Sequence, residues 1–132
     1  MMGQLSLIDI PGNAPSHNPG GKVKTALPAG LKGDAVFHGA REEYRTSLRR
    51  WIGDAFPARY VLFIGMNPST ADAAANDPTI TREWGFAVRE GFSGFVKCNV
   101  ADFCATDPRD LVSPIVMRGR PVRSLENLPT IR

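Results

Sequence analysis

The sequence predicts an α/β protein, a three-layer open parallel sheet that contains a strand–helix–strand unit. Three observations predict this fold class. An apolar run of strand length at residues 60–66 stops at a polar loop, Asp77 and Pro78 then open a helical pattern, and a second apolar run follows at residues 95–100. A strand, a helix and a strand within about 40 residues are typical of a parallel βαβ unit with a right-handed crossover.

Composition limits the class of protein. The chain has 132 residues, 42% hydrophobic and 22% charged, which is the balance of one ordinary globular domain. Its net charge of +3 comes without a long basic block, so contact with DNA is permitted but not required. We expect no signal peptide and no membrane segment. The two cysteines, Cys98 and Cys104, are too few for a four-ligand zinc site, so we expect reduced thiols in a cytoplasmic protein without metal or cofactor.

The first part of the chain has a different composition. Residues 11–21 are dense in Pro, Gly and Asn, which break regular structure and bury little apolar surface. We therefore expect residues 1–36 to form a flexible N-terminal arm and residues 37–132 to form the α/β domain.

A short peptide near the start of this arm resembles a known docking motif. Gln4-Leu5-Ser6-Leu7-Ile8 is similar to the peptide by which bacterial replication and repair proteins bind the sliding clamp. Such a peptide offers a polar Gln and several apolar side chains to a groove, although its last anchor is usually aromatic rather than Ile. The resemblance implies a sliding-clamp partner contacted by Gln4, Leu5, Leu7 and Ile8. A short strand or an unstructured start is the alternative.

Residues 41–52 are compatible with two structures. A period of 3.6 predicts a helix ended by Gly53, whereas a period of two over residues 44–48 predicts an edge strand. In both cases Arg45, Arg49 and Arg50 lie close together beside aromatic residues, and guanidinium groups bind phosphate well. We therefore assign them as phosphate or nucleic-acid contacts. The alternative is a solvated face that pairs with nearby glutamates.

The elements of the βαβ unit can be placed in order. Residues 60–66 are apolar at consecutive positions, which predicts a central parallel strand covered on both faces. The following helix begins after Asp77 and ends before Gly91. We expect its buried stripe to contain Ile80, Trp84, Ala87 and Val88. Asp107 and Pro108 open a further helical turn, and residues 124–132 are expected to begin another helix.

Polar residues follow both parallel strands of this unit. The carboxyl ends of parallel strands meet at one edge of a sheet, where open α/β folds usually bind ligands. Asn67 is the candidate catalytic residue, because its amide can position a water or a base edge, although closing a turn is its alternative role. Asp77 could equally serve only as a cap, and Arg82 only as a surface partner. The helix start adds a weak anion site. The candidate ligand-binding residues are Pro68, Ser69, Thr70, Asp72, Asp77, Thr79, Arg82, Asn99, Asp102 and Thr106.

Several separated blocks of the chain carry a family resemblance. They are Tyr44-Arg45, Arg49-Arg50-Trp51, Asn67-Pro68-Ser69-Thr70-Ala71-Asp72, Asn76-Asp77-Pro78-Thr79-Ile80, Gly85-Phe86, Asn99, and Ala105-Thr106-Asp107-Pro108. From about residue 44 to 111 the chain resembles the uncharacterised bacterial and phage family called domain of unknown function 1643. That family implies no established activity.

A more distant resemblance has chemical content. Residues 62–68, which include Gly65-Met66-Asn67-Pro68, are similar to the strand and loop of mismatch-type uracil-DNA glycosylases. In those enzymes the Asn holds the hydrolytic water and the extruded base enters a pocket at the sheet edge. The resemblance implies a glycosylase-like nucleobase or nucleotide pocket on a nucleic-acid-associated protein, with Asn67 orienting water.

The same resemblance also raises alternatives. The second-half loop that closes glycosylase sites is not found in this chain, so we expect an incomplete, N-terminal half of that fold. The protein is then a glycosylase-like hydrolase, a non-catalytic accessory module docking on a repair partner, or a small-nucleotide-binding protein. DNA or a nucleotide is the expected ligand.

Overall fold

The computed structural model describes residues 24–132, and predictions that fall on residues 1–23, including the clamp-like peptide at residues 4–8, lie outside the described residues. Four strands form the main sheet in the order β3 (Lys32–His38), β4 (Tyr44–Trp51), β7 (Gly94–Asn99) and β5 (Val61–Gly65). The α/β class is confirmed. The sheet is mixed rather than fully parallel, because only β5 and β7 run parallel, while β4 is antiparallel to both of its neighbours.

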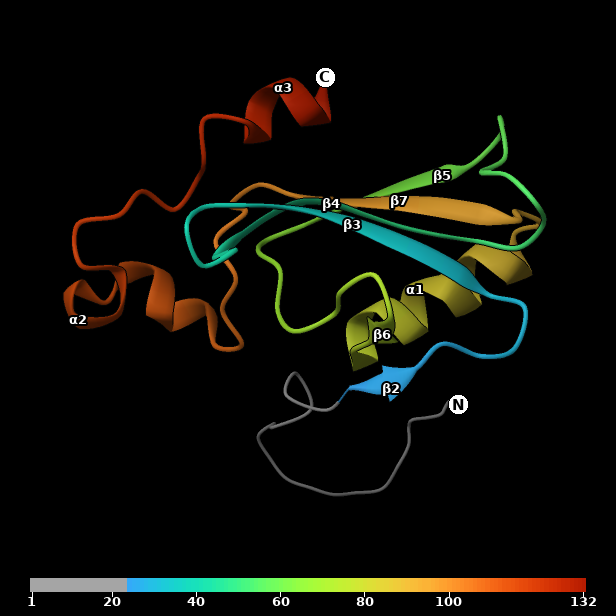
Figure 1. Ribbon diagram of the computed structural model, residues 1–132, viewed down its shortest axis with the longest axis horizontal. Coiled ribbons are helices and arrows are strands. Elements are labelled where there is room, and N and C mark those ends of the chain that lie inside the picture. Colours follow the sequence, from blue (N-terminus) through green and yellow to red (C-terminus); the bar gives the residue numbers. More distant parts are fainter. Residues whose placement is uncertain (1–23) are drawn as a thin grey trace.

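The βαβ unit forms as predicted. The helix α1 (Pro78–Arg89) connects β5 to β7, with Asp77 as its N-cap and Pro78 in its first turn. Gly91 follows the last turn with φ +82°, a conformation that glycine adopts without strain. Figure 1 shows α1 against one face of the sheet. Local capping signals therefore determine this helix at both ends.

The buried stripe of α1 is narrower than predicted. Ile80 and Ala87 are buried and Trp84 is half-buried, but Val88 is 51% exposed. Each residue turns a helix by about 100°, so Val88 lies well away from the line that Ile80 and Ala87 share. The prediction for Val88 was wrong.

Of the segment at residues 41–52, Tyr44–Trp51 form the strand β4, which lies inside the sheet. The predicted edge position is wrong, because β3 pairs with one side of β4 and β7 with the other. Residues 32–36 belong to β3, and β2 (Thr25–Ala26) pairs with β6 (Ala75–Asn76). The domain boundary predicted at residue 36 therefore falls inside a strand. A partner strand from the stretch assigned to the arm is what makes β4 internal.

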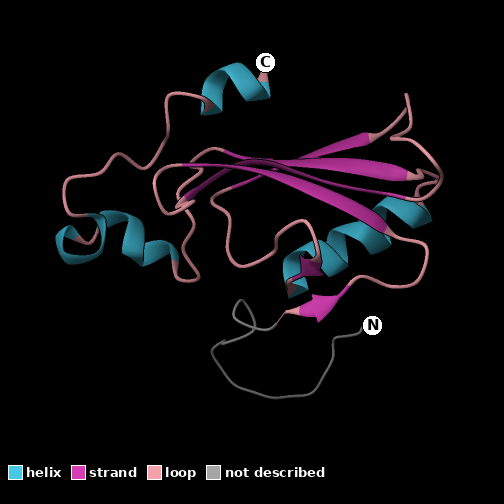
Figure 2. Ribbon diagram, in the orientation of Figure 1, coloured by secondary structure: helices cyan, strands magenta, loops and turns pink. Residues whose placement is uncertain are grey.

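The strand β5 is not the central, doubly covered strand that its apolar sequence predicted. It lies at the edge of the sheet with β7 as its only neighbour among the described strands. Leu62 is 44% exposed and Ile64 is 53% exposed, while Val61 and Phe63 pack into the core. One face of β5 is therefore covered and the other is open. Figure 2 shows α1 on one side of the sheet and the short C-terminal helix on the other.

Two apolar clusters stabilise the chain. The larger lies between the sheet and α1 and is built on Leu48, Ala71, Ile80, Ala87 and Phe95. The smaller contains Tyr44, Phe103 and Met117. It attaches the short helices η2 (Pro108–Val112) and α2 (Pro114–Met117), and α3 (Asn127–Ile131) follows. The predicted helical turns near 108 and 124–132 are confirmed. Within residues 24–132 no helix has the length and apolarity needed to cross a membrane.

Candidate functional site: a polar pocket at the ends of two parallel strands

A pocket of about 370 Å³ lies where β5 and β7 end. Its wall comes from the loop after β5, the start of α1, the end of β7 and the loop before η2, with one residue from β4. This is the edge at which the two polar segments were expected to meet. The structure brings these predicted residues to the pocket: Asn67, Pro68, Ser69, Asp77, Thr79, Asn99, Thr106 and Arg45.

Other predicted ligand-binding residues lie away from the pocket. Asp72 pairs with Lys24 at 3.2 Å and accepts from the Ala74 amide. The buried Asp102 accepts from the Ser124 amide at 2.7 Å and from the Ser124 hydroxyl, so it anchors a turn. Arg82 is exposed on α1, and Thr70 is not part of the pocket wall. These four positions are close in sequence to pocket residues, but their side chains do not line it.

The three arginines of β4 do not lie together on one exposed surface, because Arg45 and Arg50 are buried. Arg49 is ion-paired with Asp34 across β3 and β4, at 2.5 Å. Arg50 is fully buried, and it donates to the side chain of Asn76 and to the backbone oxygens of Asp72 and Ala75. Burial lowers the pKa of Arg50 to about 10, which still leaves it charged at neutral pH. Its contacts show that it fastens the 72–76 segment to the sheet.

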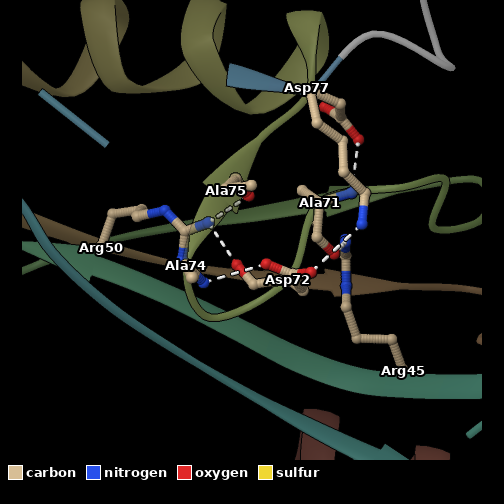
Figure 3. Close-up of polar contacts among 8 residues, drawn as sticks. Arg45, Arg50, Ala71, Asp72, Ala74, Ala75 and Asp77 are labelled. Carbon is tan, nitrogen blue, oxygen red and sulfur yellow. Dashed lines mark hydrogen bonds and ion pairs between the residues drawn. The ribbon is translucent and has the colours of Figure 1, made fainter. Parts of the chain in front are cut away.

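Arg45 reaches the same segment because of an irregularity in β4. Residues five positions apart in a regular strand point to opposite faces. The register between β3 and β4 shifts at Val36 and Phe37, so that β4 contains one extra residue between Ser47 and Arg45. Arg45 and Arg50 therefore both extend toward the segment from 71 to 77 (Figure 3). The Arg45 guanidinium donates to the Ala71 oxygen at 2.8 Å, and its Nε has no partner among the described residues.

The start of α1 is already occupied by a carboxylate. Asp77 accepts from the Ile80 amide at 2.9 Å and from the Ala71 amide at 3.2 Å. This buried side chain therefore fills the position that a bound anion would take at a helix N-terminus. The weak anion site expected there does not form.

Asn67 joins the two loops of the pocket. Its amide nitrogen donates to the Ala105 oxygen at 2.7 Å and to the Pro68 oxygen at 3.0 Å. The Ala105 amide donates back to the Pro68 oxygen at 2.8 Å. The turn-closing alternative thus describes the amide nitrogen, and any contact of Asn67 with a ligand or water has to use the amide oxygen.

The side-chain amide of Asn99, unlike that of Asn67, makes no hydrogen bond among the described residues. The side chain is 1% exposed and borders the pocket, yet neither its nitrogen nor its oxygen has a hydrogen-bond partner among the described residues. A buried amide without partners costs about 1–3 kcal/mol. Such groups are rare in folded proteins and call for an explanation. A pocket ligand that completes both hydrogen bonds supplies one.

Sequence reasoning missed an ion pair beside Asn99. Lys97 lies two residues earlier on β7, lines the pocket, and pairs with Glu83 of α1. Both side chains are largely buried, with exposures of 7% and 13%. Burial raises the pKa of the Glu83 carboxyl, and Lys97 opposes that rise. The period of two in a strand places Lys97 and Asn99 on one face, which is the signal that could have found it.

Gly65 makes room for both of these side chains. A Cβ atom at this position would lie 2.7 Å from the Lys97 Nζ and 2.9 Å from the Asn99 Nδ2. The lysine ammonium and the amide nitrogen therefore lie close together over the end of β5. Thiol chemistry at this edge is limited. Cys98 and Cys104 are free thiols, but burial raises the pKa of Cys104 to about 11, so that it stays protonated at neutral pH. Residues 24–132 contain no cluster of His, Cys, Asp or Glu that could hold a metal ion.

The comparisons with known proteins identify a family. The family described as Protein of unknown function (DUF1643) matches residues 45–124, which is more than half of the chain. The chain belongs to this family. Every residue of the pocket wall lies inside the DUF1643 match, whereas β3 and α3 lie outside it. No curated protein and no solved structure matches the chain, so the comparisons do not support the resemblance to uracil-DNA glycosylases.

Proposed function

We propose that this protein is nucleic-acid-associated and that its pocket receives a nucleobase. The observation that carries the proposal is the unpartnered amide of Asn99 on the pocket wall. An amide offers one acceptor next to a donor, and the edge of a nucleobase offers the complementary pair. Because the amide is almost shielded from solvent, the base has to seat deeply against this wall.

The size and charge of the pocket favour a base over a phosphate. Ligand pockets usually begin at about 300 Å³, and this one is at the small end of the range at about 370 Å³. Neither of its two cations is exposed, since Lys97 is ion-paired with Glu83 and Arg45 is buried with its guanidinium on the Ala71 oxygen. A phosphate site needs cations that are not already compensated. A flipped base inside, with its sugar and phosphate outside, fits this balance.

The direct test is a binding panel followed by calorimetry. Free bases and nucleosides should bind, and the matching 5′-monophosphates should bind no more tightly, because the sugar and phosphate stay outside the pocket, away from Lys97 and Arg45. The substitution Asn99→Leu should remove the binding of all of them. Absence of binding to every base, or unchanged binding by Asn99→Leu, would contradict the proposal.

Gly65→Ala offers a second test of the same wall. The added methyl group should displace the ends of the Lys97 and Asn99 side chains and weaken base binding by about tenfold or more, the effect of one lost hydrogen bond. Its cost in folding free energy should be small, since flexible side-chain ends can move.

Gly94→Ala is the matched control for this substitution. Its Cβ would lie 2.8 Å from the Pro57 ring and 3.1 Å from the backbone oxygen of Arg50, away from the pocket. It should lower stability more than Gly65→Ala, by about 1–3 kcal/mol, without a specific loss of binding. Equal binding by Gly65→Ala and wild type would show that the base does not reach this wall.

A hydrolytic form of the proposal rests on Asn67. The loop Gly65-Met66-Asn67-Pro68 leaves β5 at the pocket, and its sequence similarity to the glycosylase loop is the reason to consider hydrolysis. In this form the Asn67 amide oxygen orients the water that attacks the sugar C1′, the C1′–N bond to the base breaks, and the base leaves with a proton from the water, while the amide nitrogen stays on the Ala105 oxygen.

The hydrolytic form predicts a product that can be measured. Duplexes containing uracil, a mismatch or a modified base should yield abasic sites, detected as strand breaks after alkali on a gel. Asn67→Ala should reduce the rate by about a hundredfold, the effect of removing a positioning group from a water-excluding site. A protein that binds bases but forms no abasic product has the binding function alone.

A further inference from the structure

The ion pair between Lys97 and Glu83 is poorly explained by stability. A buried pair of this kind is often no more stable than a pair of apolar side chains of the same shape. This pair is also incompletely satisfied, because the second carboxylate oxygen of Glu83 is buried without a partner among the described residues. An incompletely satisfied buried pair beside a pocket is typical of a functional group.

Lys97 is positioned to contact the same ligand as Asn99. The two residues lie two positions apart on β7, and the Lys97 Nζ and the Asn99 Nδ2 both approach Gly65. An ammonium group has three N–H donors, and Glu83 accepts from it through one oxygen. The remaining donors can serve a ligand oxygen adjacent to the edge that Asn99 would bind.

Four charged groups determine the field at this point. Lys97 of β7 and Arg45 of β4 favour the Glu83 carboxylate, whereas Asp77 at the start of α1 and burial disfavour it. A ligand oxygen that takes a hydrogen bond from Lys97 therefore competes with Glu83 for the same cation. A neutral oxygen competes poorly, and an oxygen with substantial negative charge competes well.

We propose that Lys97 is a specificity-determining residue of the pocket, donating to an exocyclic carbonyl oxygen of the bound base and selecting bases in which that oxygen bears negative charge. This inference rests on the proposed function. The ligand class is an oxo-heterocycle with two ring N–H groups: one donates to the Asn99 oxygen, and the other is acidic, so that its anion places charge on an exocyclic carbonyl oxygen. Glu83 determines how much negative charge the ligand oxygen needs, because Glu83 holds the Lys97 ammonium when no such oxygen is present.

The test compares uracil with 5-fluorouracil, whose ring N–H is more acidic. With the full chain at neutral pH, calorimetry should show tighter binding of 5-fluorouracil. Lys97→Met should weaken the binding of 5-fluorouracil by about tenfold or more, since a charge-assisted hydrogen bond is lost. The affinities for 5-fluorouracil and uracil should then be equal. Glu83→Gln should widen the difference, because it frees the ammonium.

Two further variants complete the design. Lys97→Met leaves Glu83 buried without its cation, so the double variant Glu83→Gln/Lys97→Met, which removes both charges, provides a second version of the test and should also bind the two compounds equally. Lys32→Met, at an exposed position of β3, is the matched control and should keep the wild-type ratio.

The outcomes separate the two proposals. If the double variant still prefers 5-fluorouracil and Asn99→Leu abolishes binding, the role of Lys97 is wrong and the nucleobase pocket stands. If wild type binds neither compound, the role of Lys97 is overturned, and if it binds no base of the panel, the nucleobase pocket is overturned as well. Loss of the preference in the Lys97 variants, with uracil binding retained, supports the inference.

Discussion

Replacing Arg50 by methionine is expected to lower the free energy of unfolding by about 3–5 kcal/mol, the scale for removing one member of a buried hydrogen-bonded network. The Arg50 guanidinium donates to Asn76 at 2.8 Å and to the Ala75 oxygen at 2.9 Å, and it also contacts the Asp72 oxygen. Methionine keeps the length of the side chain but leaves these acceptors buried and unpaired. Urea denaturation followed by circular dichroism measures the change.

Arg49→Met is the matched control. Arg49 is the next residue of the same strand, but it is about 39% exposed and paired with Asp34 near the surface. Exposed pairs contribute about 0–1 kcal/mol, so this variant should stay within that range. Equal losses for the two variants would show that Arg50 does not hold the 72–76 segment. Arg50→Lys should resemble Arg50→Met, because an ammonium cannot reproduce the planar fork.

These arginines show where sequence reasoning reached its limit. The βαβ unit was predictable because its signals are local: Asp77 and Pro78 begin the helix, and Gly91 ends it. The burial of Arg50 depends on carbonyl groups more than twenty residues away, and the direction of Arg45 depends on the register shift between β3 and β4. No pattern within residues 41–52 specifies either of them. Three clustered arginines therefore resembled a surface that binds phosphate.

The edge position of β5 has the same origin. Its apolar sequence is that of a strand covered on both faces. The position of a strand in the sheet, however, depends on which other strands pair with it and with its neighbour. The antiparallel strand β4 occupies the other side of β7, and β3 pairs beyond it. The convergence of Asn67 and Asn99 was predictable in spite of this, because it depends only on the parallel pairing of β5 with β7. Which of the converging groups is unpartnered was not predictable, since that depends on every neighbour.

Asn99→Leu is expected to raise the free energy of unfolding while removing nucleobase binding. The Asn99 amide is buried without partners, so the folded protein carries a desolvation cost of about 1–3 kcal/mol that an apolar side chain of similar shape avoids. A gain of stability on mutation is typical of positions kept for function. Thermal and urea denaturation of the ligand-free protein measure the gain, and calorimetry measures the loss of binding.

Asn67→Leu is the matched comparison for the stability effect of Asn99→Leu. The substitution is identical and the position lies on the same pocket wall, but the Asn67 amide nitrogen already donates to the Ala105 and Pro68 oxygens. Asn67→Leu should therefore lower stability by about 1 kcal/mol or more, since the Ala105 oxygen loses this donor and the Pro68 oxygen keeps only the Ala105 amide. Opposite signs at two asparagines of one pocket would distinguish an amide that builds the pocket from one that awaits a ligand. If Asn99→Leu destabilises the protein as Asn67→Leu does, its amide is satisfied without a ligand, and the central support for a nucleobase pocket is lost.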